Sequence, residues 1–581
     1  MSSKDELIDM ILVASGCREA SANRREKAAL HCQTFKESQK VWRKCLGLLV
    51  QGLGASILQE AGNSTNHAQV VNFLLNVVLS GIRREYRDLS EGERKHTRAA
   101  LMQLAGQMSK PNSNRSSSSN EMPPSLLYPP FLRNKIAVVL VAVLQVDYPE
   151  RWPDFFKVIL SSLKEGASRV DMFLRILDAV DNDIVGYDEK RTKSEVYQIN
   201  KIKHHMQDTC INEIMSALMA MTKGLKANHK PLAKKAMELI KEYTTWIKLE
   251  LVTSQKFLEF VFGIIRSDQS LRSIGLDILN EVIRKKTDFA QKVLILQKST
   301  ILNLLDAQIY EVVKILSVSK DAVAMANELN QNEFLESLAA AVDSAVVQAL
   351  GCIESLVAQK RHAQLLGEAI PPDVDKAVSV GFQTVVRAML QALKILEIPL
   401  WKVANELKGA LDAFIGFAAK VKNNEIVNCP RELCDGKALL KIADRILERC
   451  EFPREYDHEN SDVEEANFDE YRRAIEYTFV NLVRNFGNIV LPHLFQNIAK
   501  IVRDAKHVRP SLIEAGLRLL YRVYEGAPNK QKDQLTKSGM IPKIMALVID
   551  SRISTHPDVA LSLVYVELVS RYSGFLTNSP Q

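Results

Sequence analysis

Helix-forming segments recur in pairs along almost the whole sequence. Each segment spaces its apolar residues three and four positions apart, and a short turn joins the two members of a pair. The clearest pairs are residues 22–38 with 39–54, 66–86 with 90–109, 130–146 with 153–164, 169–184 with 196–223, 231–251 with 255–266, 470–486 with 491–506, and 511–524 with 531–549, and residues 269–286 pair with the helix after Asp288. No region shows the sustained two-residue alternation that is typical of strands.

The pairs follow one another at about 40–47 residues, the period of HEAT-type repeats. We therefore predict an all-α fold, an α-solenoid superhelix of antiparallel helix pairs in which each pair buries its apolar face against its neighbours. Chain length agrees, because 581 residues are too many for one compact core. Two polar segments interrupt the array: residues 112–120, and the acidic loop 455–470, which has eight carboxylates and no Lys or Arg.

One stretch, FLRNKIAVVLVAVLQVDYPERWPDFF at residues 131–156, is more apolar than a surface helix needs to be. A helix that is apolar on nearly all sides must be buried on nearly all sides, as an inner helix of a stack is. Pro149 disfavours helix at the residue before it and ends the first helix. Pro153 suits the first turn of the next helix, and Trp152 is most simply a wedge between the two.

The same stretch resembles the third HEAT repeat of exportins in the importin-β superfamily, and its FLRNKIA version is most similar to the exportin-T family of tRNA exporters. Two further motifs carry the resemblance: VDMFLRILDAVDNDIV at residues 170–185, and FDEYRR at 468–473, which follows the acidic loop. The resemblance extends loosely over residues 23–528.

This resemblance implies a nuclear export receptor that binds Ran-GTP together with mature tRNA, passes nuclear pore proteins and shuttles between nucleus and cytoplasm, most simply as a monomer. It implies Ran binding by N-terminal repeats in residues 1–165 and a tRNA-binding arch in 166–581. Family members are considerably longer and have a second arch. A chain that stops at Gln581 leaves open a short isoform or a fragment, and whether tRNA is fully enclosed.

Candidate contacts follow from the resemblance and from the basic clusters. For Ran, the candidates lie on the second helices of the first three pairs: Trp42, Arg43, Arg94, Lys95, Arg98, Phe155 and Lys157. For tRNA phosphates they are Lys223, Lys226, Lys230, Lys234, Lys235, Lys285, Lys286, Arg518 and Arg522. Each set has a plainer alternative, which is core packing for Trp42 and Phe155 and a solvated helix face for the basic clusters.

Other functions find little support in the residues. There is no phosphate-binding GxxxxGK[ST] loop and no HExxH, and the calcium-like run at residues 181–186 has Thr192 where a bidentate Glu is needed. We therefore expect no enzyme activity, no metal and no cofactor of its own, GTP being held by Ran. The N-terminus is not a convincing secretory signal, and the longest apolar run, residues 136–144, is too short for a bilayer span, so no membrane insertion is expected.

Two alternatives to tRNA export stay open at this point. One is a karyopherin-like solenoid for protein or other RNA cargo. The other is a short form that binds Ran without carrying tRNA.

Overall fold

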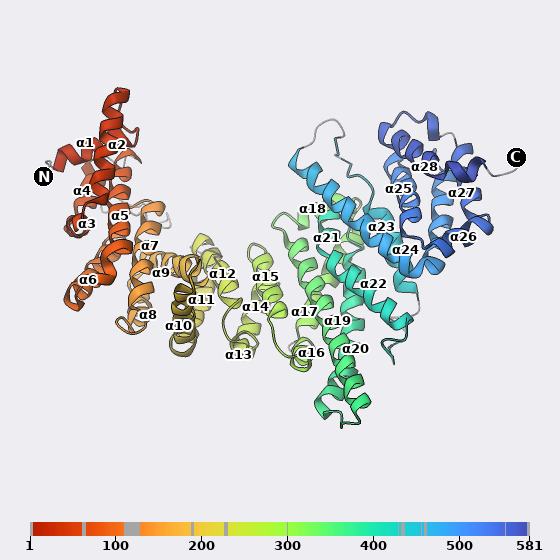
Figure 1. Ribbon diagram of the computed structural model, residues 1–581, viewed down its shortest axis with the longest axis horizontal. Coiled ribbons are helices and arrows are strands. Elements are labelled where there is room, and N and C mark those ends of the chain that lie inside the picture. The colour runs from red at the N-terminus through yellow and green to blue at the C-terminus, as the bar shows by residue number, and fades with distance from the viewer. Residues whose placement is uncertain are drawn as a thin grey trace. The chain divides into compact units, whose positions relative to one another are not determined.

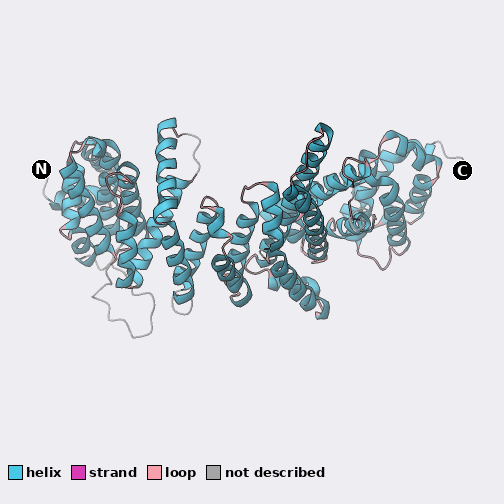
Figure 2. Ribbon diagram, turned by 90° about the horizontal axis from the view of Figure 1, so that it is seen from below, coloured by secondary structure: helices cyan, strands magenta, loops and turns pink. Residues whose placement is uncertain are grey.

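The computed structural model describes residues 4–60, 65–109, 128–186, 191–225, 230–298, 300–427, 429–430, 436–454, 456–457, 462–551 and 553–577. Figure 2 shows helices and loops and no strand in these ranges, so the predicted all-α class is confirmed. The chain forms two compact units, Met1–Leu251 and Val252–Gln581. The predicted functional boundary at residue 165 falls inside the first unit, and the polar segment 112–120 lies outside the described residues.

The first unit is a stack of helices and short helical turns in chain order (Figure 1). Its elements are α1 (Lys4–Ala14), α2 (Ala22–Glu37), α3 (Val41–Val50), α4 (Leu53–Glu60), α5 (Thr65–Glu85), η1 (Tyr86–Asp88), α6 (Glu91–Met108), α7 (Pro130–Asp147), α8 (Phe155–Ser161), η2 (Ser162–Glu165), α9 (Ala167–Val180), η3 (Asp181–Val185), α10 (Lys193–Thr209), α11 (Ile211–Leu225) and α12 (Lys230–Thr244). The short α13 (Leu249–Val252) lies at the boundary of the units.

Two rows of helices build this unit. In one row α5 packs on α7, α7 on α9, and α9 on α12; in the other, α3 packs on α6 and α8 on α11. The apolar helix α7 lies inside the first row, and ten of its eighteen residues are buried, as its composition predicts. Trp152 lies in the corner after it and packs edge-on against Phe155, with 4.7 Å between ring centroids.

The second unit contains the longest helices. Its elements are α14 (Gln255–Ser267), α15 (Arg272–Arg284), α16 (Phe289–Lys298), α17 (Ile301–Val318), α18 (Ala322–Leu329), α19 (Phe334–Leu366), α20 (Pro372–Ile395), α21 (Trp401–Glu406), α22 (Lys408–Lys422), α23 (Lys437–Arg449), α24 (Val463–Arg503), α25 (Pro510–Gly526), α26 (Asn529–Lys537), α27 (Met540–Asp550), η5 (Ile553–Thr555) and α28 (Val559–Thr577). Helices α19 and α20 form an antiparallel hairpin, and α22, α24, α25 and α28 then pack one on the next.

The predicted pair 470–486 and 491–506 falls on α24, which consists of two helices joined across a kink at Phe486 (φ −132°, ψ 22°). The first helix contacts α25 through the Arg472–Glu514 ion pair, and Ile498 of the second lies beside Gly516 of α25. Both halves therefore lie along the same stretch of α25, as expected for two helices that fold back on each other. The break falls at the end of the first predicted helix, next to Gly487 and Asn488.

Among the described residues, α19 alone is long and apolar enough by length and composition to cross a membrane. Half of its most apolar window is buried within the protein. Core helices of soluble proteins meet the same criterion.

Candidate Ran and RNA interfaces

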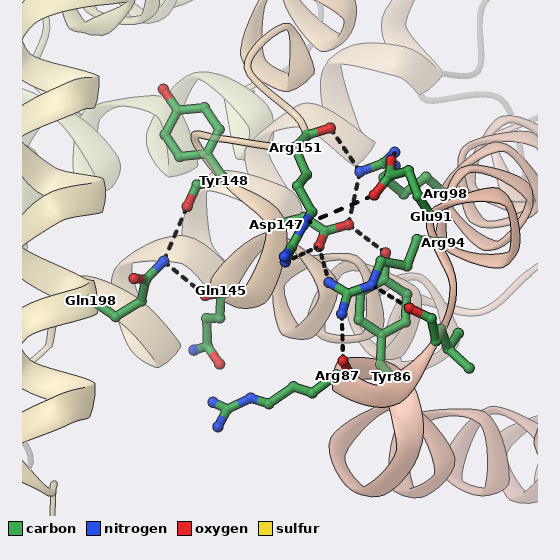
Figure 3. Close-up of polar contacts among 11 residues, drawn as sticks. Tyr86, Arg87, Glu91, Arg94, Arg98, Gln145, Asp147, Tyr148, Arg151 and Gln198 are labelled. Carbon is green, nitrogen blue, oxygen red and sulfur yellow. Dashed lines mark hydrogen bonds and ion pairs between the residues drawn. The ribbon is translucent and has the colours of Figure 1, made fainter.

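A fully buried carboxylate, Asp147, organises the N-terminal repeats (Figure 3). It accepts hydrogen bonds from the Tyr86 hydroxyl (2.6 Å), from Nη1 of Arg94 (2.9 Å) and from Nη1 of Arg98 (2.8 Å). Burial and this hydrogen bond raise the pKa of Tyr86, which keeps its hydroxyl a donor. These bonds tie η1 and α6 to the last turn of α7.

Arg94 and Arg98, two predicted Ran contacts, are therefore internal ties. Their side chains are 7% and 8% exposed, and Arg94 also donates to the backbone carbonyls of Leu89 (3.0 Å) and Arg87. A guanidinium held by a buried carboxylate cannot be withdrawn for a partner without a large desolvation cost. Any part they take in partner binding is to position the exposed residues of α6.

Two predicted aromatic contacts, Trp42 and Phe155, are also buried. The indole N–H of Trp42 donates to Glu85 at 2.9 Å. Its ring lies directly on Gly81 of α5, where an added Cβ would come within 2.1 Å of the Trp42 ring. Only glycine fits there, so the α3–α5 contact is a close-packed one, and the core-packing alternative describes both aromatic residues.

The exposed part of the predicted Ran surface is a groove of about 560 Å³ between α3 and α6. Apolar Leu46 and Val50 line the α3 side, and Ala99 and Ala100 the α6 side. An Arg43–Glu93 ion pair (2.6 Å) also lines the groove. The hydrogen bonds from Ser90, together with Arg43, lower the pKa of Glu93 to about 2, so the pair stays charged at neutral pH.

Lysines and glycines leave this region accessible. Lys95 on α6 and Lys157 on α8 are exposed. Gly47, which lines the groove, has no atom within 4 Å of the place where a Cβ would lie, and neither has Gly92. Of the seven predicted Ran contacts, Arg43, Lys95 and Lys157 can thus reach a partner directly.

The predicted tRNA contacts divide in the same way. Lys223, Lys230, Lys234 and Lys286 are exposed, and Lys285 is half-buried. Lys235 donates to Asp178 on α9 at 2.7 Å and so ties two helices of one row. Lys226 lies outside the described residues.

Arg518 and Arg522 on α25 are held by a second buried carboxylate. Glu476 on α24 is 2% exposed and accepts from Nε of Arg518 (3.1 Å) and from Nε of Arg522 (2.7 Å). Both arginines have a further carboxylate partner, Glu567 and Glu525 respectively. Much of their charge is therefore balanced within the unit.

The same cluster extends deeper, where Arg472 on α24 pairs with Glu514 on α25. Both side chains are buried, and the burial raises the pKa of Glu514.

Sequence reasoning missed the buried carboxylates of both units. The available signal was a charged residue on the apolar stripe of a helix, as Glu476 is in the run RRAIEYTF.

Comparisons with known proteins now bear on these surfaces. A family model described as exportin 1-like protein matches residues 129–279. The chain is 22% identical to exportin-T of Homo sapiens over 570 residues, which cover 97% of this chain and 53% of the relative. Exportin-T of Arabidopsis thaliana is 22% identical over 591 residues, which cover 99% and 53%. A solved structure of Kap121p bound to Nup53p aligns with 10% identity, a TM-score of 0.44, and coverage of 99% of this chain and 55% of that one.

The fold defines the chain first as a helical-repeat protein, and residues 129–279 match the exportin 1-like family model. More particularly, the resemblance to exportin-T, which the sequence predicts from three short motifs, is confirmed over nearly the whole chain. The chain spans about half the length of the curated relatives it matches.

Proposed function

We propose that this chain is a nuclear export receptor that binds Ran in its GTP form together with mature tRNA and shuttles with them between nucleus and cytoplasm. The observation that carries the proposal is the similarity to exportin-T over 97% of the chain. An accessible groove and exposed cations on helices where the family resemblance expects partners support it.

The Ran surface in this proposal is the α3–α6 groove with Arg43, Lys95 and Lys157. The groove offers small apolar residues for close approach of a partner, and the cations at and near it suit an acidic one. Arg94, Arg98, Trp42 and Phe155 hold α3, α6 and α8 in place behind this surface.

The tRNA surface consists of exposed lysines that bind phosphates. A-form RNA hides its base edges in a deep groove, so a receptor for many tRNAs reads shape, phosphates and 2′-hydroxyls. Lys223, Lys230 and Lys234 suit that role because they project from neighbouring parts of α11 and α12. Phosphate contacts of this kind make binding strongly salt-dependent.

Ran and tRNA should each raise the affinity of the chain for the other by the same factor, because coupling between two sites is reciprocal. The test is filter binding of labelled tRNA with no Ran, with Ran-GDP and with Ran locked in its GTP form. Tighter binding with Ran-GTP alone is expected. Equal tRNA affinity in all three conditions would exclude the coupling.

Glycine substitution tests the Ran groove without removing a structural contact. Gly47→Leu fills the groove at a position with free space, and replacing a helical glycine stabilises a helix by up to about 1 kcal/mol. Gly416→Leu on α22, equally open, is the matched control. Ran-GTP binding should fall in the first variant and persist in the second; equal binding by both would remove the groove from the interface.

The open alternatives predict other results. Pull-down from nuclear extract with and without RNase separates RNA cargo from protein cargo, because protein cargo survives RNase. A short form that only binds Ran would show Ran-GTP binding with no tRNA retained.

A further inference from the structure

A second recess in the first unit lies apart from both proposed surfaces. It has a volume of about 1000 Å³ and is bounded by the ends of α5 and α7, by η3 and by α10. None of the residues predicted to contact Ran or tRNA lines it. Its size is at the upper end of the range for ligand sites.

Helix α10 makes one wall of the recess and is anchored by its polar side chains. The Nε2 atom of Gln198 donates to the backbone carbonyl of Tyr148 at 3.3 Å, Lys203 donates to that of Val185 at 2.9 Å, and Gln207 to that of Trp246 at 2.7 Å. These carbonyls lie at or just past the ends of α7, η3 and α12, where a helix leaves carbonyls unpaired. The wall is therefore tied to three successive elements of one helix row.

Arginines outnumber carboxylates in the lining of the recess, with Arg83, Arg87 and Arg191 against Asp183 and Glu195. Arg191 donates to the backbone carbonyl of Asp183 at 3.0 Å. Arg83 and Arg87 are exposed and make no ion pair or side-chain hydrogen bond in the described residues, although Arg83 attracts the Asp183 carboxylate and Arg87 that of Glu195. The adjacent Arg84 pairs with Glu85 at 3.0 Å. Figure 3 shows the Arg87 side chain extending away from the Asp147 cluster. One basic residue at the end of α5 is expected, because it complements the negative end of that helix. This effect does not account for two basic residues that line the same recess.

The remaining lining excludes a polyphosphate chain as the best ligand. Ala142 and Val146 form a half-buried apolar floor, backed by the buried Ile199 and Ile202. Asp183 and Glu195 also line the recess. Three arginines against two carboxylates leave a net charge of +1 on the lining, which is too little to hold a run of phosphates, whereas one or two peptide carboxylates can pair with Arg83 and Arg87.

We propose that this recess binds a short acidic peptide segment of a protein partner. The carboxylates of the peptide pair with Arg83 and Arg87, and one apolar side chain of the peptide packs on Ala142 and Val146. The guanidinium forks give charge-assisted hydrogen bonds to carboxylates, and the apolar floor gives the segment its register.

The test uses the full chain and a fluorescein-labelled peptide in which leucines alternate with aspartates and glutamates, followed by fluorescence anisotropy. Saturable binding is expected, at least about tenfold weaker for the Arg83→Gln/Arg87→Gln double variant. Arg84→Gln is the matched control, since it removes the same charge from the same turn outside the recess, and its affinity should stay within about twofold. The analogue peptide with asparagine and glutamine should also bind at least about tenfold more weakly.

Two results would overturn the proposal. One is equal binding of the acidic and amide peptides, or no binding of either. The other is displacement of the peptide by pyrophosphate or a single-stranded RNA oligonucleotide at lower concentration than by unlabelled peptide, which would make the recess a phosphate site. Ran-GTP and tRNA binding by the double variant should be unchanged, so failure here is distinguishable from failure of the export function.

Discussion

The two units use buried carboxylates differently, and the difference separates structural arginines from accessible ones. In the first unit, Asp147 takes up Arg94 and Arg98 and leaves Lys95, Lys157 and the α3–α6 groove exposed beside them. In the second, Glu476 and its neighbours engage the arginines that the sequence offers as RNA contacts.

A basic cluster in a sequence therefore does not by itself mark a nucleic-acid surface. An arginine of such a cluster is available to a partner only when no buried carboxylate on a neighbouring helix binds its guanidinium. The side chains of Lys223, Lys230 and Lys234 are exposed, whereas those of Arg518 and Arg522 face the buried Glu476 on α24.

The largest effect should come from removing the carboxylate at Asp147. Asp147→Ala leaves two buried guanidiniums and the Tyr86 hydroxyl without their acceptor, which should lower the local unfolding free energy by about 3–5 kcal/mol. Hydrogen exchange of peptides from α6 and α7 measures this, with α25 peptides as an internal reference. Asp88→Asn, an exposed neighbour, is the control; similar protection in both variants would mean that Asp147 is not the tie between these helices.

Glu476→Gln should have a smaller effect and lower the local unfolding free energy of α24 and α25 by about 1.5–3 kcal/mol, because the amide keeps one acceptor oxygen. The same variant releases charge on Arg518 and Arg522. If these arginines contribute to the tRNA surface, tRNA affinity should rise in the variant despite the lost stability. Unchanged or weaker tRNA binding, in a variant whose exchange is altered only in α24 and α25, would assign both arginines to the fold alone.

The exposed lysines of α11 and α12 are predicted phosphate contacts, and their substitution tests whether they bind tRNA. Replacing Lys223, Lys230 and Lys234 together by Gln should weaken tRNA binding roughly 10- to 100-fold and reduce the salt slope by about 3. Lys235→Gln is the matched control from the same cluster, since its charge is held by Asp178 and its loss should affect packing more than binding. A salt slope that is the same for the triple variant and the wild type would rule these lysines out as phosphate contacts.

Helical periodicity was enough to predict most of the fold. The buried α7 follows from its apolar composition, and its end from Pro149, because these are local properties of the chain. The break in α24 at Phe486 also follows the predicted boundary between residues 470–486 and 491–506, next to Gly487 and Asn488.

The exposure of the candidate contacts could not be read from the sequence. Arg94 and Asp147 are 53 residues apart, and Glu476 and Arg522 are 46 apart, so each pairing depends on how repeats stack. A helix pattern says which face is apolar, but a long Arg on that face can lie in solvent or end on a buried carboxylate. The recess beside α10 likewise exists only where four separate elements meet.

A half-buried carboxylate that has no guanidinium partner in the described residues extends the comparison. Asp343 on α19 accepts from the backbone N–H of Ala410 at 2.5 Å and makes no ion pair in the described part of the chain. Burial raises its pKa to about 6, above the value of 3.8 for an exposed Asp. Between these two values the folded chain holds a proton that the unfolded chain has lost, so stability falls as pH rises from about 4 to about 6.

Asp343→Asn removes this titration while keeping an acceptor for Ala410. As the pH rises from 4.5 to 7.5, the free energy of unfolding of the variant should therefore increase by about 1–2 kcal/mol relative to that of the wild type. Hydrogen exchange of α19 and α22 peptides, compared between the two proteins at each pH, measures this change. Removing the Asp343 carboxylate should stabilise the fold, whereas removing the Asp147 carboxylate should destabilise it at both pH values, because two guanidiniums stabilise Asp147. A difference between Asp343→Asn and wild type that does not change with pH would show that the Asp343 carboxylate is better solvated than its burial implies.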